Sequence, residues 1–122
     1  MKKKCLLIGT VLFIMSSVAF AGQEKIAVAA NGETPEASVS SRLGWAPFIL
    51  FFDANGKFVG AFVNPAKDGL TAADLLAKKG ATVIVAEWFG PGIVEVLKEK
   101  GIKAVAFTGI AEVAVKGVLP GK

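Results

Sequence analysis

The segment ATVIVAEWFGPGIVEVLKEKGIKAVAF, residues 81–107, decides the fold of this chain. An apolar run over 81–86 is typical of a buried strand, and a second run over 102–107 has the same character. Between them, Gly90-Pro91-Gly92 introduces a helical pattern over 93–100. A strand, a helix and a strand in this order predict two parallel strands joined by a right-handed crossover.

Three further strands are predicted before this segment. Residues 25–30 form a short apolar run that ends at a turn signal, Asn31-Gly32. Residues 45–52 are almost wholly apolar, and residues 57–63 follow them across the tight-turn pair Asn55-Gly56. These two runs therefore predict an antiparallel hairpin.

Two further helices are predicted, one over 70–79 and one from Thr108-Gly109 to about Lys116. In the first, Thr71 is expected to cap the N-terminus, and Asp74 three residues later would complete a capping box. Gly80 follows this helix and is expected to end it.

The order of these elements predicts an α/β protein with three layers, α/β/α, around a mixed five-stranded sheet. In such sheets ligands bind beyond the carboxyl ends of the parallel strands. This rule places three segments around one rim: residues 31–44, residues 87–92 and Thr108-Gly109. The first of them is a long polar loop, so we expect a functional site there.

Residues 1–21 have the pattern of a removable export signal. Three lysines, Lys2 to Lys4, precede an apolar stretch over 5–15, and Ala19-Phe20-Ala21 has the small-x-small pattern of a cleavage site. The sequence therefore predicts a signal peptide over 1–21, a single domain over 22–122, and a periplasmic or secreted protein that meets the membrane only during export. An uncleaved membrane anchor is the alternative, although Ser16 and Ser17 interrupt the apolar stretch.

Cleavage would change the charge and the chemistry of the chain. The net charge would fall from +4 to +1, and the remaining lysines form no stripe of the kind that follows a phosphate backbone. Nucleic acid is therefore not an expected partner. The only cysteine, Cys5, would leave with the signal, and the chain has no histidine.

Several segments resemble the dinitrogenase iron-molybdenum cofactor binding domain, the small domain of NifX, of NafY and of the C-terminal part of NifB. They are KIAVAANG at 25–32, VSSRLGWAPFILFFD at 39–53, Asn64-Pro65, residues 75–107, and TGIAEVAV at 108–115. The resemblance implies an RNase H-like fold and a non-enzymatic protein that carries a metal cluster. The resemblance also implies that this cofactor is an iron–molybdenum or iron–sulfur cluster.

The chain departs from the family pattern at the rim. Members commonly read Ser-x-His-Phe-Gly-Arg-Ala, and the resemblance implies that this histidine contacts the cluster. Here the stretch begins at Ser40, with Arg42 at the histidine position and Trp45 at the arginine position. Glu87-Trp88-Phe89 replaces the small glycines that usually precede Gly-Pro.

The candidate cofactor-binding residues all lie on the predicted rim. An anionic cofactor could be held there by Arg42 and by free N–H groups at the helix starts. No catalytic residue and no metal ligand is predicted, because thiolate and imidazole, the usual ligands of iron–sulfur clusters, are missing after residue 21. The candidates are Asn31, Ser40, Arg42, Gly44, Trp45, Glu87, Trp88, Gly90, Gly92, Thr108 and Gly109.

Two other functions remain open on the residues alone. The chain could be an interaction module that contacts a protein partner through Arg42, Trp45, Trp88 and Phe89. The chain could also be a hydrolase, which would need several carboxylates that converge on a metal ion. Glu87 could belong to such a metal site only together with Glu33, Glu36 or Asp53.

Overall fold

The computed structural model describes residues 24–119. The predicted export signal over 1–21 lies outside the described residues. None of the helices within 24–119 is long and apolar enough to cross a membrane.

The described residues form one mixed sheet of five strands, in the order β3-β2-β1-β4-β5. Strand β1 at the centre pairs antiparallel with β2 and parallel with β4. The hairpin partner β3 and the last strand β5 lie at the two edges. This arrangement confirms the predicted α/β class and the mixed five-stranded sheet. The strands are β1 (Ile26–Ala30), β2 (Phe48–Phe52), β3 (Phe58–Val63), β4 (Val83–Ala86) and β5 (Lys103–Ala106).

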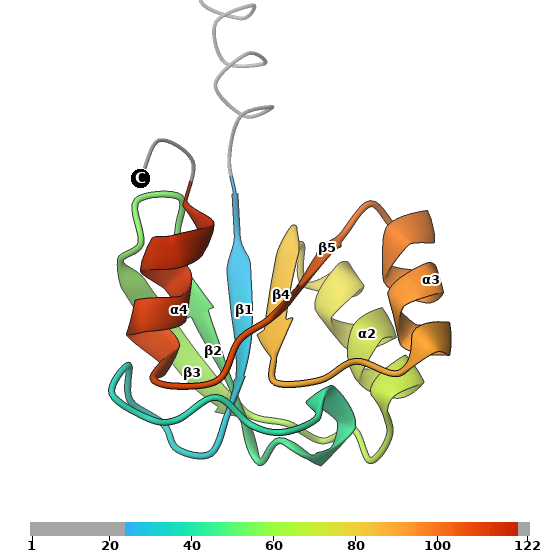
Figure 1. Cartoon of the computed structure of the whole chain (residues 1–122), viewed down its shortest axis with the longest axis horizontal. Helices are drawn as coiled ribbons and strands as arrows, with labels where there is room; N and C mark the ends of the chain where they lie inside the picture. Colours follow the sequence, from blue (N-terminus) through green and yellow to red (C-terminus); the bar gives the residue numbers. More distant parts are fainter. Residues whose placement is uncertain (1–23, 120–122) are drawn as a thin grey trace, which may run out of the picture.

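Helices cover both faces of the sheet and complete the three layers. On one face, α2 (Gly69–Lys78) and α3 (Pro91–Glu99) lie side by side, and α4 (Ala111–Val118) lies on the other (Figure 1). Buried Leu76 of α2 and Leu97 of α3 belong to the first core cluster, whereas Val115 of α4 belongs to the second.

Strand β1 separates the two cores. All five of its residues are at most 1% exposed. Because side chains alternate along a strand, Ala27 and Ala29 point into the core beneath α2 and α3, while Ile26, Val28 and Ala30 point into the core beneath α4. This double burial explains why residues 26–30 are apolar without alternation.

Three local predictions were wrong. Asp68, not Thr71, caps α2: its carboxylate accepts a hydrogen bond of 2.8 Å from the Thr71 backbone N–H. The last helix begins at Ala111, because Thr108 and Gly109 still belong to the loop. Trp45 does not begin β2 but ends a short 3₁₀ helix, η1 (Leu43–Trp45). The predicted end of α2 is confirmed, since Gly80 follows it with a positive φ angle of 88°. Gly101 follows α3 in the same way, with a φ angle of 77°.

Replacement of Leu97 by alanine tests how α3 is held on the sheet. Leu97 is the buried residue of this helix and is 0% exposed. We expect Leu97→Ala to lower the free energy of unfolding by about 2–5 kcal/mol, because it removes buried methyl groups and leaves a cavity. Val94→Ala on the same helix is the matched control, since Val94 is 39% exposed. Urea denaturation of both variants checks the expectation, and equal losses would contradict it.

Candidate functional site

The three predicted rim segments meet in the structure. The Glu87 N–H donates to the carbonyl of Ser40 at 2.9 Å, and the Trp88 N–H donates to the carbonyl of Ser41 at 3.0 Å. On the other side, the Val39 N–H donates to the carbonyl of Gly109 at 2.8 Å. The long loop is therefore fixed between the ends of β4 and β5, which confirms the predicted rim.

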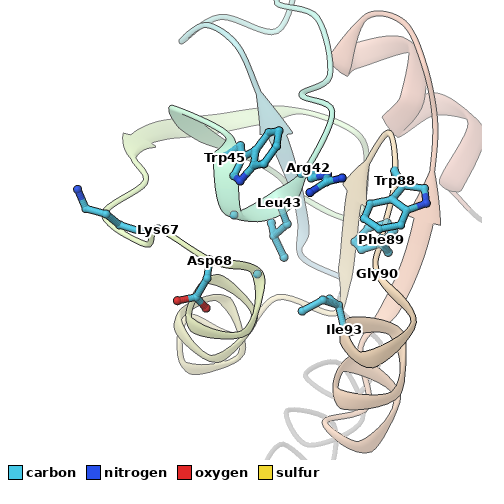
Figure 2. Close-up of a pocket in the computed structure, with 11 residues that line it drawn as sticks. Arg42, Leu43, Trp45, Lys67, Asp68, Trp88, Phe89, Gly90 and Ile93 are labelled. Carbon is cyan, nitrogen blue, oxygen red and sulfur yellow. The ribbon is translucent and has the colours of Figure 1, made fainter.

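A cavity of about 270 Å³ opens at this rim, between η1 and the first turns of α2 and α3 (Figure 2). Its volume is close to the lower end of the range for small-molecule sites. The walls are mainly aromatic and aliphatic, with a few charged side chains at the mouth. The lining residues are Arg42, Leu43, Gly44, Trp45, Lys67, Asp68, Gly69, Trp88, Phe89, Gly90 and Ile93.

The guanidinium group of Arg42 lies between two indole rings (Figure 2). Its central carbon is 4.4 Å from the centroid of the Trp45 ring and 4.7 Å from that of the Trp88 ring. Such cation–π contacts hold the guanidinium beside the rings without the use of an ion pair. Within residues 24–119, the ion pairs involve Asp74 with Lys78 and Lys100, and none involves Arg42. The N–H groups along the guanidinium edge therefore remain available to an anion.

Asn64 holds the turn that carries Arg42 and Trp45. The side chain is only 9% exposed, and its amide Nδ2 donates to the carbonyls of Leu43 at 3.2 Å and Ala46 at 3.0 Å. Its Oδ1 accepts from the Ala66 N–H at 3.1 Å. The start of the connection between β3 and α2 is thereby tied to η1, on the opposite side of the cavity from α3.

Gly44 allows α2 to approach η1 at backbone distance. A Cβ atom at this position would lie 2.5 Å from the carbonyl carbon of Asp68 and 2.6 Å from the backbone nitrogen of Gly69. A Cβ at Gly69 would in turn meet Ile93 of α3 at 2.8 Å. Two glycines thus set how closely the three walls of the cavity pack.

The first turns of α2 and α3 both reach the cavity, but they differ in capping. The Asp68 carboxylate accepts from the Thr71 backbone N–H and side-chain hydroxyl, and these hydrogen bonds lower the pKa of Asp68 below its usual value of 3.8. The first turn of α3 starts at Gly90 and Pro91 and has no side-chain cap. Of the two, the α3 turn is therefore the one that presents an uncompensated positive end.

The structure brings five of the predicted site residues into the cavity wall: Arg42, Gly44, Trp45, Trp88 and Gly90. The other six lie on or near the rim but outside the cavity lining. Asn31 stabilises a turn through Ser38, and Ser40 is buried with its hydroxyl on the carbonyl of Arg42. The remaining residues outside the lining are Glu87, Gly92, Thr108 and Gly109.

The wall formed by α2 was missing from the sequence interpretation. Lys67, Asp68 and Gly69 line the cavity because η1 packs on the start of this helix. Asp68 followed by Gly69 was a usable capping signal, since aspartate is a preferred N-cap residue. Nothing in the order of the residues indicated that this cap lies beside Gly44.

The carboxylates do not form a metal site in the part of the chain that the structure describes. No group of three or more His, Cys, Asp or Glu side chains comes together within residues 24–119. A group of three or more carboxylates that would join Glu87 with Glu33, Glu36 or Asp53 around a metal ion is therefore not found there.

Comparison with known proteins agrees with this architecture. Residues 24–120 match the family model described as dinitrogenase iron-molybdenum cofactor. The apo form of the orange protein from Desulfovibrio gigas is 30% identical, with a TM-score of 0.68 over 76% of this chain and 84% of that one. No curated protein matches the chain.

Two more distant solved structures share the fold. A candidate NifB protein from Thermotoga is 24% identical, with a TM-score of 0.65 over 77% of this chain and 85% of that one. A candidate dinitrogenase from Methanocaldococcus jannaschii is 12% identical, with a TM-score of 0.53 over 76% of this chain and 88% of that one.

Replacement of Gly44 by alanine tests the close approach of α2 and η1. The added methyl group would overlap the backbone of Asp68 and Gly69, which cannot turn away as a side chain can. We expect Gly44→Ala to lower the free energy of unfolding by about 1–3 kcal/mol through overpacking. Gly92→Ala is the control, because a Cβ at Gly92 meets nothing within 4 Å. Thermal unfolding measures both, and an unchanged Gly44→Ala variant would contradict this packing.

Proposed function

This chain belongs to the dinitrogenase iron-molybdenum cofactor family, and from that premise we propose that it is a non-enzymatic carrier of an anionic metal–sulfur cluster. The cluster would be held in the cavity beside Arg42. The observation that carries the proposal is the position of the Arg42 guanidinium, which lies between Trp45 and Trp88 with no ion-pair partner among the described residues.

The lining residues fit a cluster that is held by charge and hydrogen bonds. Iron and molybdenum in sulfide clusters are usually ligated by thiolate or imidazole, and the cavity wall contains neither. Arginine N–H groups are instead suited to hydrogen bonds with the outside of an anion.

One relative supports a removable ligand. The structure from Desulfovibrio gigas is described as the apo form of the orange protein, and apo is the term for a protein that also has a ligand-bound form. Its identity to this chain is 30% over most of both chains. A coloured and removable group would be a consistent cargo for the present chain.

We also propose that the carrier works outside the cytoplasm. The support is the sequence pattern of residues 1–21, with its lysines, its apolar stretch and its Ala-x-Ala site. The cysteine that could ligate a cluster lies within that pattern, so an exported domain would depend on contacts that do not ligate the metal.

The contribution of Arg42 to anion affinity can be measured with tetrathiomolybdate, a coloured dianion that contains molybdenum and sulfide. The chain has two tryptophans, Trp45 and Trp88, and both lie at Arg42, so intrinsic fluorescence reports on this site. We expect titration to quench the fluorescence with saturation. We expect Arg42→Ala to weaken binding by about 10- to 100-fold, because hydrogen bonds to a charged group contribute about 1.5–3 kcal/mol.

The control for net charge is Lys116→Ala, which removes a positive charge from exposed α4 on the other face of the sheet. This variant should bind as the original chain does. Arg42→Lys should bind more weakly than the original, since an ammonium group cannot present the planar fork of a guanidinium. Equal affinities for the original chain and Arg42→Ala would overturn the role of Arg42.

A second candidate function rests on the exposure of the same aromatic side chains. Trp45 is 65% exposed and Trp88 is 50% exposed, although tryptophan is highly buried on average. Exposed tryptophan beside arginine is typical of the residues that dominate protein interfaces. On this second proposal the chain is an interaction module, and Arg42, Trp45, Trp88 and Phe89 contact a protein partner.

Native mass spectrometry of the protein from its own host separates the two candidates. For the carrier, we expect the mass of residues 22–122 together with a metal–sulfur adduct and a matching metal content. For the interaction module, the expected species is the same domain in complex with a second protein and without metal. A species that retains residues 1–21 would contradict the export proposal.

A further inference from the structure

Apart from one β-bulge near Phe58, the edge strand β3 has none of the usual protecting features in its own sequence. Its sequence, FVGAFV, contains no charged residue and no proline, and it lies at the end of the sheet. Natural edge strands usually carry lysine, proline or an inward-pointing charge, because an open strand pairs readily with another chain. Val59 and Val63 are 65% and 68% exposed on this strand. The features point to an edge that is paired in the working protein.

The backbone groups that face outward from β3 can be assigned from its pairing with β2. The Asn64 N–H donates to the carbonyl of Pro47 at 3.0 Å, just beyond the paired residues Phe48 and Val63. Hydrogen-bonded and non-hydrogen-bonded pairs alternate in an antiparallel ladder. Phe62 and Gly60 therefore bond to β2, and the N–H and C=O groups of Ala61 and Val63 face away from the sheet.

A hollow of about 480 Å³ lies beside this edge and shares no lining residue with the Arg42 cavity. Gly60 forms part of it, and a Cβ at Gly60 would meet nothing within 4 Å. Phe51 and Phe62 also line the hollow, with their rings stacked at 5.4 Å and 18°. Lys25 and Lys79 complete the lining, with their ammonium groups 4.8 Å and 4.9 Å from the centroids of the Phe51 and Phe62 rings. The hollow is therefore a recess with aromatic walls and two lysines, next to a glycine on an open strand.

We propose that a second copy of this chain pairs with β3, antiparallel and about a twofold axis at Ala61. Paired residues in a ladder point to the same face of the sheet, so a symmetric register must place one residue of the strand opposite its own copy. Ala61 lies in the middle of the regular segment and has outward-facing N–H and C=O groups. With Ala61 on the axis, Gly60 of each copy lies opposite Phe62 of the other. The partner's Phe62 then fills the recess over Gly60, as aromatic side chains cover glycines on neighbouring strands.

The length of the paired strand sets the expected strength of this dimer. The bulge between Phe51 and Phe52 disturbs the ladder near Phe58, so the regular part of the edge is Gly60–Val63. A contact of this length falls below the roughly 1,200 Å² of stable interfaces, and we expect a dissociation constant in the micromolar range or weaker. Pairing at β3 leaves the Arg42 cavity free, because the two sites have no lining residue in common.

Substitutions that place opposite charges at Ala61 test whether the partner is a second copy of the chain and whether Ala61 lies on the twofold axis. The protein is expressed as the full 122-residue chain, and its mass in solution is followed by sedimentation velocity over a wide concentration range. We expect the original chain to shift from monomer to dimer as the concentration rises. Ala61→Glu and Ala61→Lys should each remain monomeric, because like charges would lie directly opposite each other on the axis. An equimolar mixture of the two variants should recover the dimer.

The control is Val113→Glu, which adds the same charge at an exposed position of α4 and should leave dimerisation unchanged. Circular dichroism establishes that each variant is folded. An original chain that stays monomeric at every concentration would overturn the proposal, as would a dimer that Ala61→Glu does not weaken. If both single variants are monomeric and their mixture is monomeric too, the proposed register would be overturned. Because no cluster is added, these outcomes do not depend on whether the chain carries a cargo.

Discussion

The complete burial of β1 is the constraint on which the rest of the structure depends. A strand whose every residue is at most 1% exposed must be covered on both faces and paired on both edges. The hairpin β2–β3 supplies one edge and β4 the other, while α2 with α3 and α4 supply the two covers. The chain therefore leaves β1, β4 and β5 at the same end of the sheet, and that end is where its connecting loops meet.

The cavity at this rim follows from close backbone packing as much as from its side chains. Gly44 lets η1 contact the first turn of α2, and the Asn64 side chain donates hydrogen bonds to two backbone carbonyls at η1. On that support the Arg42 guanidinium is fixed between Trp45 and Trp88. A positive group with N–H donors that form no ion pair among the described residues suits an anion, and this is the basis of the proposed carrier function.

Much of the fold and about half of the candidate site were predictable. The apolar runs, the Asn-Gly turn and the glycine after α2 determine local conformation, so they identified the strands and the end of that helix. The cap of α2 was assigned to Thr71 because both Asp68 and Thr71 are good N-cap residues, and only the backbone path shows which one precedes the helix. Lys67, Asp68 and Gly69 were missed as cavity residues because their neighbours there, Gly44 and Ile93, lie more than 20 positions away.

The sequence by itself determined the α/β class, the mixed sheet and the three rim segments. Hydrophobic periodicity and turn residues act over a few neighbouring positions, so they identify each element, and the right-handed crossover then fixes how the parallel strands are connected. It also determined that no histidine lies anywhere in the chain and that the only cysteine is Cys5. Only the tertiary structure decided that Arg42 stacks between Trp45 and Trp88, that α2 forms a wall of the cavity, and that Gly60 opens a recess at a free edge. These features depend on contacts between distant segments, which form when the layers pack together and have no local pattern in the sequence.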